Sequence, residues 1–281
     1  MIEGREPWIW TKGDADLHEE LDGQHLRSQC FEGSFTEHWY QGRGVYGGLS
    51  AAVILHAMQQ MEPNRSPRTF TLHCPKPVLN KPTIVKTEIE YRGGKVTHLS
   101  GRLLQKGEDD TYTMVAFASA SFGEARSFNR NYPAEVAPQA PRPHEVVEVP
   151  KESPIMPAFC KHFTYRFCLD ALPYTGDKIA ALGGWIDLRE DYVLSFPYIA
   201  TLLDAWPPAV FSTLKAPLRA ASIDFTYHFL CNEQQLVSLE KPFLYRGKQF
   251  SLADGYAEER NWLWDAKGLP VGTARQLYAI G

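Results

Sequence analysis

Cysteines are few in this sequence and lack the spacing of a metal or redox motif. The five are Cys30, Cys74, Cys160, Cys168 and Cys231, and no two of them form a Cys-x-x-Cys pair. An odd number of scattered cysteines builds neither a disulfide framework nor a zinc site. We therefore expect free thiols, no metal and a reducing, cytoplasmic compartment.

The lack of a basic charge surplus and of a long apolar run excludes two further classes of function. The formal net charge is −4, so the chain lacks the basic surplus that would hold a nucleic acid, and we expect no nucleic-acid partner. No apolar run approaches the roughly 20 residues needed to cross a bilayer, so we expect no membrane span. With 281 residues, 44% of them hydrophobic, the chain can form one large core or two modest ones.

Proline accumulates in one stretch between residues 123 and 157. Because proline fixes φ and lacks a backbone donor, such a stretch favours an extended linker over a helix or a strand. The sequence thus predicts an N-terminal domain over residues 1–123, a linker over 124–158 and a C-terminal domain over 159–281.

The two halves carry an internal repeat. Thr69–His73 (Thr-Phe-Thr-Leu-His) corresponds to Asp224–His228 (Asp-Phe-Thr-Tyr-His), 155 residues later. Tyr91–Lys95 corresponds to Tyr245–Lys248, 154 residues later, so one loop residue reconciles the two offsets. Repeats of this length indicate a duplicated structural unit.

Each half contains one helix candidate and several strand candidates. Gly48–Met61 consists of good helix formers and ends before a proline; its apolar first turns predict burial on most sides. Phe196–Trp206 has proline in its first turn and two prolines at its end. We expect an α+β fold in which a long antiparallel sheet wraps around a buried helix, twice over. The strand candidates are 31–40, 96–105 and 112–122 in the first half and 163–169, 184–188, 255–264 and 269–280 in the second.

Three segments resemble a known family. His38–Ala52 is similar to the strand, glycine turn and central helix of hot-dog thioesterases. Ser222–Phe229 resembles the aspartate-bearing strand of type II (TesB-like) acyl-CoA thioesterases, and Thr273–Gln276 resembles their terminal strand. The resemblance implies a double hot-dog fold, two tandem repeats in one chain, that hydrolyses acyl-CoA to the free acid and CoA. It implies an acyl-CoA substrate, no cofactor and a homo-oligomer.

In that family an aspartate, a glutamine and a serine or threonine of the second repeat hold the attacking water. Asp224 matches the aspartate and Gln276 the glutamine. The family's spacing places the hydroxyl at Phe250, one residue before Ser251. Since neighbouring strand residues face opposite sides, either a bulge turns Ser251 inward or the hydroxyl is missing or replaced, with Thr226 a distant option.

The same residues suit the chemistry of thioester hydrolysis. A carboxylate partly withdrawn from water, such as Asp224, can accept a proton from the attacking water. The glycines of Tyr46-Gly47-Gly48 open the first helix, where unpaired N–H groups and the helix dipole favour an oxyanion and allow a thioester to approach closely. The turn is also explained by strand-to-helix geometry alone. In the first repeat, Thr69 occupies the position that Asp224 has in the second. The first repeat therefore lacks the acidic group, and we expect one active site per chain.

Other interpretations remain open at this stage. Asp204, in the second helix, is a rival acidic group, although a hydrogen bond at a helix terminus explains it equally well. The uncertain hydroxyl allows a non-catalytic hot-dog protein that binds acyl-CoA or a related ligand. A hot-dog hydratase or dehydratase is disfavoured, because no Asp–His pair lies near either helix.

Overall fold

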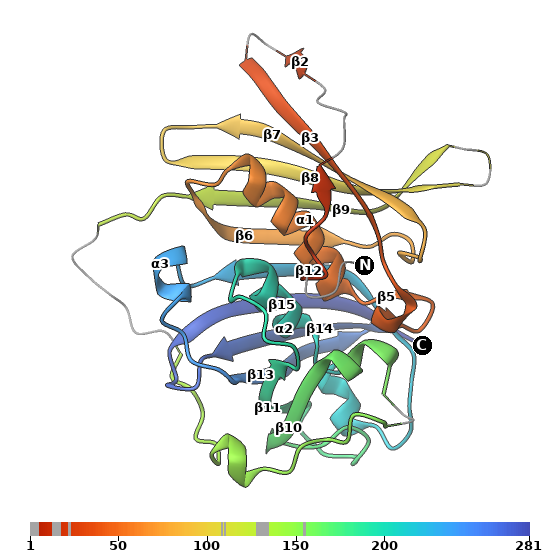
Figure 1. The fold of residues 1–281 in the computed structure, drawn as a ribbon. Helices are drawn as coiled ribbons and strands as arrows, with labels where there is room; N and C mark the ends of the chain where they lie inside the picture. The colour runs from red at the N-terminus through yellow and green to blue at the C-terminus, as the bar shows by residue number, and fades with distance from the viewer. Residues whose placement is uncertain are drawn as a thin grey trace.

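A computed structural model describes residues 6–12, 18–21, 24–107, 109, 111–127, 135–153 and 156–281. Within them, thirteen strands form one antiparallel sheet that curves around two helices (Figure 1). The order along the sheet is β1-β3-β7-β8-β9-β6-β12-β15-β14-β13-β11-β10, with β2 paired to β3, and a small β4-β5 ladder lies apart. None of the helices in these ranges is long and apolar enough to cross a membrane.

The first repeat holds the strands from β1 to β9. Its helix is α1, Gly47–Met61, which is buried along most of its length, as its apolar first turns predict. The strands are β1 (Thr11–Lys12), β2 (His18–Leu21), β3 (Gln24–Ser34), β4 (Tyr40–Gln41), β5 (Gly44–Val45), β6 (Ser66–His73), β7 (Pro82–Arg92), β8 (Val96–Lys106) and β9 (Tyr112–Gly123).

The second repeat holds β10 to β15 and the helix α2, Phe196–Asp204. The side chain of Ser195 accepts the N–H of Tyr198 and so begins α2. A short helix, α3 (Glu233–Leu236), follows β12. The strands are β10 (Phe163–Asp170), β11 (Ala181–Leu188), β12 (Ala220–Phe229), β13 (Phe243–Ala253), β14 (Tyr256–Trp264) and β15 (Pro270–Ile280).

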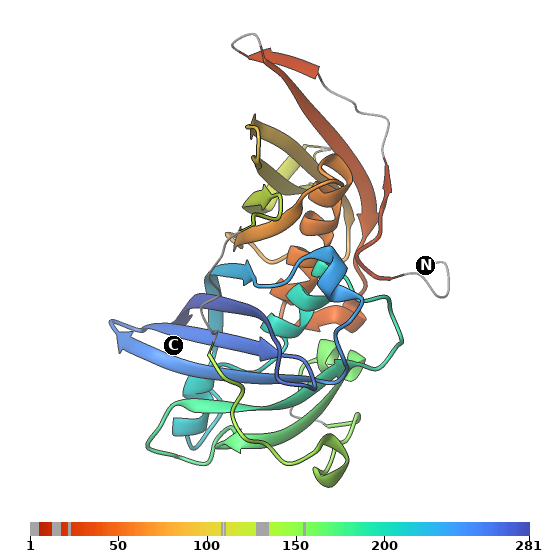
Figure 2. The ribbon, with the colours of Figure 1, turned by 90° about the vertical axis from the view of Figure 1, so that its left-hand side faces the viewer.

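The repeats meet where β6 pairs with β12. Thr71 lies opposite Thr226, Asp224 opposite His73 and Thr69 opposite His228. These pairs follow the offset of 155 residues, so the junction has approximate twofold symmetry. The order β7-β8-β9-β6 on one side is mirrored by β12-β15-β14-β13 on the other. In the turned view, red-to-yellow strands lie above green-to-blue ones, with a helix inside each half (Figure 2).

Most predicted elements are confirmed, with one clear departure. The run predicted as a strand over 31–40 ends at Ser34 in β3, and Glu37–Trp39 forms a 3-10 turn instead. Trp39 is buried there and stacks on His162 of the second repeat, with ring centroids 3.7 Å apart. This tertiary contact overrides the local preference of the segment for extended structure.

The proline-rich segment contains no strand among its described residues, and it packs on the second repeat. Trp185 donates its indole N–H to the carbonyl of Pro141 at 2.8 Å, and Trp264 donates to that of Glu135 at 2.9 Å. The backbone N–H of Val149 donates to Tyr165 of β10. The segment therefore runs along the sheet of the second repeat rather than free of it.

Candidate active site

A small pocket forms where the two repeats meet. It lies between the first residues of α1, the last residue of α2, the end of β6 and the start of β12. Its cavity volume is about 10 Å³, close to the space that one water molecule requires. Its lining residues are Gly47, Leu72, Cys74, Asp204, Ser222, Ile223, Asp224 and Phe225.

The beginning of α1 is held by a carboxyl group from the other repeat. Tyr46, the N-cap residue, makes no capping hydrogen bond with its own side chain, and the N–H of Gly48 bonds instead to the carboxyl of Asp204. A Cβ on Gly47 would lie 2.8 Å from Asp204 Oδ2, and one on Gly48 would lie 2.6 Å from the Tyr46 ring. The glycines predicted to open this helix are thus required by the close approach of Asp204 and Tyr46.

The carboxyl group of Asp204 has a raised pKa. Although it lines the pocket, protein surrounds its carboxyl group, and this burial raises its pKa to about 7. The hydrogen bond from Gly48 opposes the shift, and the nearby charge of Glu259 adds to it. Asp204 therefore exchanges its proton near neutral pH.

Asp224 lines the same pocket from β12. It follows a bulge between Ser222 and Asp224, where Ile223 is the extra residue. Its Oδ1 accepts the backbone N–H of Leu277 on β15 at 3.3 Å, and the residue is half-buried. The bulge and the neighbouring strand together fix this carboxylate at the pocket wall.

Gln276 reaches the pocket through Ser222. Its Nε2 donates to Ser222 Oγ at 2.5 Å, and the glutamine is buried. Gln276 lies opposite Phe225 on β12 and opposite Glu259 on β14. The hydroxyl of Ser222 therefore links Gln276 to the pocket that Asp224 also lines.

The structure does not bring Ser251 to this pocket. A bulge interrupts β13 between Gln249 and Ser251. Ser251 then lies opposite Glu258, whose side chain is on the other face of β14 from that of buried Glu259. Phe250, the extra residue of the bulge, is half exposed and lies against the guanidinium of Arg260 at 4.2 Å.

Three predicted binding residues, Tyr46, Gly48 and Thr226, lie outside the pocket lining. Thr226 meets Thr71 across the junction, and their hydroxyl oxygens are 3.0 Å apart. Tyr46 is buried, and its ring stacks on Phe159 at 4.4 Å. Tyr46 supports the turn before α1, whereas Gly47 itself lines the pocket.

A second buried acid, Glu259 on β14, lies close enough for its charge to act on Asp204. Glu259 accepts hydrogen bonds from the N–H of Ala209 and from the hydroxyls of Tyr278, at 2.8 Å, and Tyr245, at 3.3 Å. Burial raises its pKa to about 7, although these bonds favour the charged form. The cluster holds Ala209, in the segment that follows α2.

Comparisons with known proteins identify the family. A family model described as the acyl-CoA thioesterase C-terminal domain matches residues 133–280, and one described as the N-terminal domain matches 35–123. This chain belongs to the acyl-CoA thioesterase family. No curated protein sequence matches it.

Solved structures share the double hot-dog fold of this thioesterase family member. A conserved hot-dog protein from Alicyclobacillus acidocaldarius is 22% identical, with a TM-score of 0.81 over 93% of this chain and 95% of its own. The acyl-CoA thioesterase II TesB2 from Mycobacterium marinum is 18% identical, with a TM-score of 0.69 over 90% and 93%. The tesB protein of Mycobacterium avium subs. paratuberculosis is 16% identical, with a TM-score of 0.70 over 90% and 93%.

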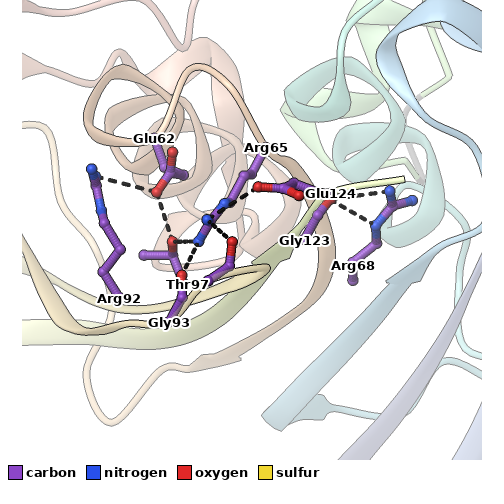
Figure 3. A network of polar contacts seen from close by, with 9 residues as sticks. Glu62, Arg65, Arg68, Arg92, Gly93, Thr97, Gly123 and Glu124 are labelled. Carbon is purple, nitrogen blue, oxygen red and sulfur yellow. Dashed lines mark hydrogen bonds and ion pairs between the residues drawn. The ribbon is translucent and has the colours of Figure 1, made fainter. Parts of the chain in front are cut away.

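A network of polar contacts lies at the other end of α1, after its last turn. Just after α1, the acid Glu62 is buried and accepts the hydroxyl of Thr97 at 2.6 Å, with Arg92 at 3.2 Å (Figure 3). Arg65 donates to Thr97, to Glu124 and to two carbonyls of the β7–β8 turn. Arg65 and Arg92 thus tie the end of α1 to the β7–β8 turn and to β8.

Of the residues that the sequence predicts for the site, Asp224 and Gly47 line the pocket and Gln276 bonds to its lining residue Ser222, which the sequence analysis did not predict. Ser222 lies in the quoted motif, yet nothing in the sequence shows that it meets Gln276, 54 residues later. Asp204 was only a rival for the acidic role, since its bond to Gly48 crosses 156 residues. The run Leu-Leu-Asp before two prolines was the one local signal for it.

Proposed function

We propose that this chain hydrolyses acyl-CoA thioesters, with a water activated by Asp224 as the nucleophile. The observation that carries the proposal is the meeting of Asp224, the Ser222–Gln276 pair and the beginning of α1 at one pocket. Membership of the acyl-CoA thioesterase family supports the same reaction class.

The reaction assigns a role to each group. Asp224 accepts a proton as the water oxygen attacks the thioester carbon. Ser222 and Gln276 orient that water with neutral hydrogen-bonding groups. The N-terminal end of α1 stabilises the negative charge that develops on the carbonyl oxygen. The carbon–sulfur bond then breaks, and the CoA thiolate takes the proton back from Asp224, leaving free acid and CoA.

A thiol-release assay over short, medium, long and aromatic acyl-CoAs tests the proposal. We expect turnover by the wild-type chain and a fall in kcat of about 100-fold or more in Asp224→Asn, the range for loss of a general base. Thr69→Ala is the matched control, because Thr69 is the symmetry equivalent of Asp224 on β6. Turnover that survives unchanged in Asp224→Asn would rule out this mechanism.

A binding function is the second candidate. It is favoured by one observation: β13 supplies Phe250 and Ser251 outside the pocket lining, so the hydroxyl expected from that strand is not at the site. Tight acyl-CoA binding by calorimetry, together with no thiol release from any substrate, would establish that function in place of hydrolysis.

A further inference from the structure

The wall of the pocket continues inward as two rows of side chains across the junction of the repeats. Leu72 on β6 lies opposite Phe225 on β12, and both residues line the pocket. Two positions further along β12, and therefore on the same face of the strand, Tyr227 lies opposite Phe70 of β6. All four side chains are buried. We refer to the second row, Phe70 and Tyr227, as the floor of the pocket.

Aromatic contacts close the floor. The ring centroids of Phe225 and Tyr227 are 4.4 Å apart, and those of Phe70 and Tyr227 are 5.8 Å apart. Phe229 continues the row, with its ring stacked on that of Tyr227 at 6.3 Å. Because protein interiors are closely packed, a long acyl chain that runs inward from the pocket would have to displace these rings. The floor therefore favours a short acyl group.

The floor carries one polar atom that the fold does not use. The hydroxyl of Tyr227 is buried and has no hydrogen-bond partner among the described residues. Electrostatic interactions link it to Asp204 and Cys74, both of which line the pocket. Burial raises the pKa of Tyr227 well above its ordinary value, so the hydroxyl keeps its proton and can donate it in a hydrogen bond. A buried polar group without a partner is rare in folded proteins, and a bound ligand is one explanation for it.

The internal symmetry shows that the junction does not need this hydroxyl. By the repeat offset of 155 residues, Tyr227 corresponds to Leu72, and Phe225 corresponds to Phe70. The first repeat thus places an apolar side chain where the second repeat places a phenol. The hydroxyl is present on one side of the junction only, and this is the side that also carries Asp224.

Resting on the function proposed above, we propose that the substrate is the CoA thioester of a short acyl group that carries a hydroxyl or carbonyl oxygen, and that Tyr227 binds this oxygen. The floor limits the length of the acyl group, and the hydroxyl of Tyr227 recognises the oxygen. Buried hydrogen-bonding groups discriminate strongly against an analogue that lacks the partner atom, because they are then left unpaired. Tyr227 determines specificity and takes no part in breaking the thioester.

A panel of acyl-CoAs that differ in one feature at a time tests the proposal. It consists of butanoyl-CoA, its 2-, 3- and 4-hydroxy forms, 3-oxobutanoyl-CoA and dodecanoyl-CoA. We expect kcat/KM for at least one oxygen-bearing substrate to exceed that for butanoyl-CoA by about tenfold, the effect of one hydrogen bond. Dodecanoyl-CoA should be the poorest substrate. A preference for dodecanoyl-CoA, or equal kcat/KM for butanoyl-CoA and all its oxygen-bearing forms, would overturn the proposal.

Tyr227→Phe removes only the hydroxyl. We expect kcat/KM for the preferred oxygen-bearing substrate to fall by about tenfold, and that for butanoyl-CoA to stay at the wild-type value. Because the hydroxyl has no partner in the described structure, the urea midpoint should stay the same or rise. A lower midpoint with an unchanged ratio of the two substrates would show a structural role and contradict the assignment.

Tyr198→Phe is the matched control. Tyr198 is also a buried tyrosine, but it lies on α2 and its hydroxyl donates to the carboxyl of Asp187. Loss of this bond should lower the urea midpoint and leave the ratio of kcat/KM values between the oxygen-bearing substrate and butanoyl-CoA unchanged. A change in this ratio as large as that in Tyr227→Phe would show that the ratio does not report on the floor, and the proposal would fail.

A binding measurement separates this inference from the proposed reaction. Calorimetry on Asp224→Asn gives the Kd of each acyl-CoA of the panel without rapid turnover. At least one oxygen-bearing acyl-CoA should bind about tenfold more tightly than butanoyl-CoA, and Tyr227→Phe in the same background should abolish the difference. Equal Kd values would overturn the inference whatever the rates. Selective binding without thiol release by the wild type would instead overturn the hydrolytic function and leave the specificity of the floor in place.

Discussion

Gln276 and Ser222 are joined by a hydrogen bond of 2.5 Å between strands β15 and β12, 54 residues apart in the chain. The bond places a hydroxyl beside Asp224, where Ser251 was expected to provide one. In the proposed site, the hydroxyl therefore comes from the strand that carries the aspartate. This reassignment can be tested directly.

Ser222→Ala should lower kcat by about tenfold, which corresponds to the loss of about 1.4 kcal/mol in the transition state. The change removes the partner of Gln276 Nε2 and one orienter of the water. Ser251→Ala should leave kcat unchanged, since Ser251 is exposed and lies opposite Glu258. Steady-state thiol release from one acyl-CoA compares the two, and the reverse pattern would return the role to Ser251.

Gly47→Ala should lower kcat by about 100-fold, because small displacements of catalytic groups have effects of this size. The new Cβ would lie 2.8 Å from Asp204 Oδ2 and force this carboxyl away from the beginning of α1. Gly94→Ala is the matched control, because a Cβ there would meet nothing within 4 Å. Equal kcat in Gly47→Ala and wild type would show that the contact between Gly47 and Asp204 is dispensable.

Stability should fall as the pH rises from about 5 to 8. The pKa of Glu259 rises from 4.5 in its ordinary state to about 7 in the fold, so between these values the folded chain holds a proton that the unfolded chain has lost. The stabilisation is full below pH 4.5 and is lost as the pH passes about 7. Asp204 acts in the same direction.

Urea midpoints at pH 5, 6, 7 and 8 measure this dependence. Glu259→Gln should reduce the change in the free energy of unfolding between pH 5 and 8. The reduction should be at most a few kcal/mol, since one pKa unit is worth about 1.4 kcal/mol. Glu258→Gln, the half-buried neighbour on the other face of β14, should keep the wild-type slope. An equal slope in Glu259→Gln and wild type would contradict the assignment.

Arg65→Ala should lower the free energy of unfolding by about 3 kcal/mol, the effect of breaking a buried ionic network. Arg65 is mostly buried and ties Thr97, Glu124 and the β7–β8 turn together (Figure 3). Arg102→Ala, which breaks a partly exposed ion pair with Glu88, should cost about 1 kcal/mol or less. Denaturant unfolding measures both, and kcat should stay at the wild-type value because the network lies away from the pocket.

The sequence by itself determined the duplicated fold. The repeat offset of 155 residues reappears as the pairing of Thr71 with Thr226 at the junction, and the apolar run after Gly47 became a buried helix. These features rest on local signals: periodicity, proline and glycine at element ends, and a short motif repeated in order. Local signals survive in any fold that satisfies them, so they can be found before the structure is known.

Only the tertiary structure decided the composition of the site. A single bulge residue, Phe250, sets which face Ser251 occupies, and bulges leave no reliable mark in the sequence. The bonds from Gln276 to Ser222 and from Gly48 to Asp204 join elements that meet only when the sheet closes around both helices. The protonation of Asp204 follows from burial, which is a property of the packed molecule and of no segment alone.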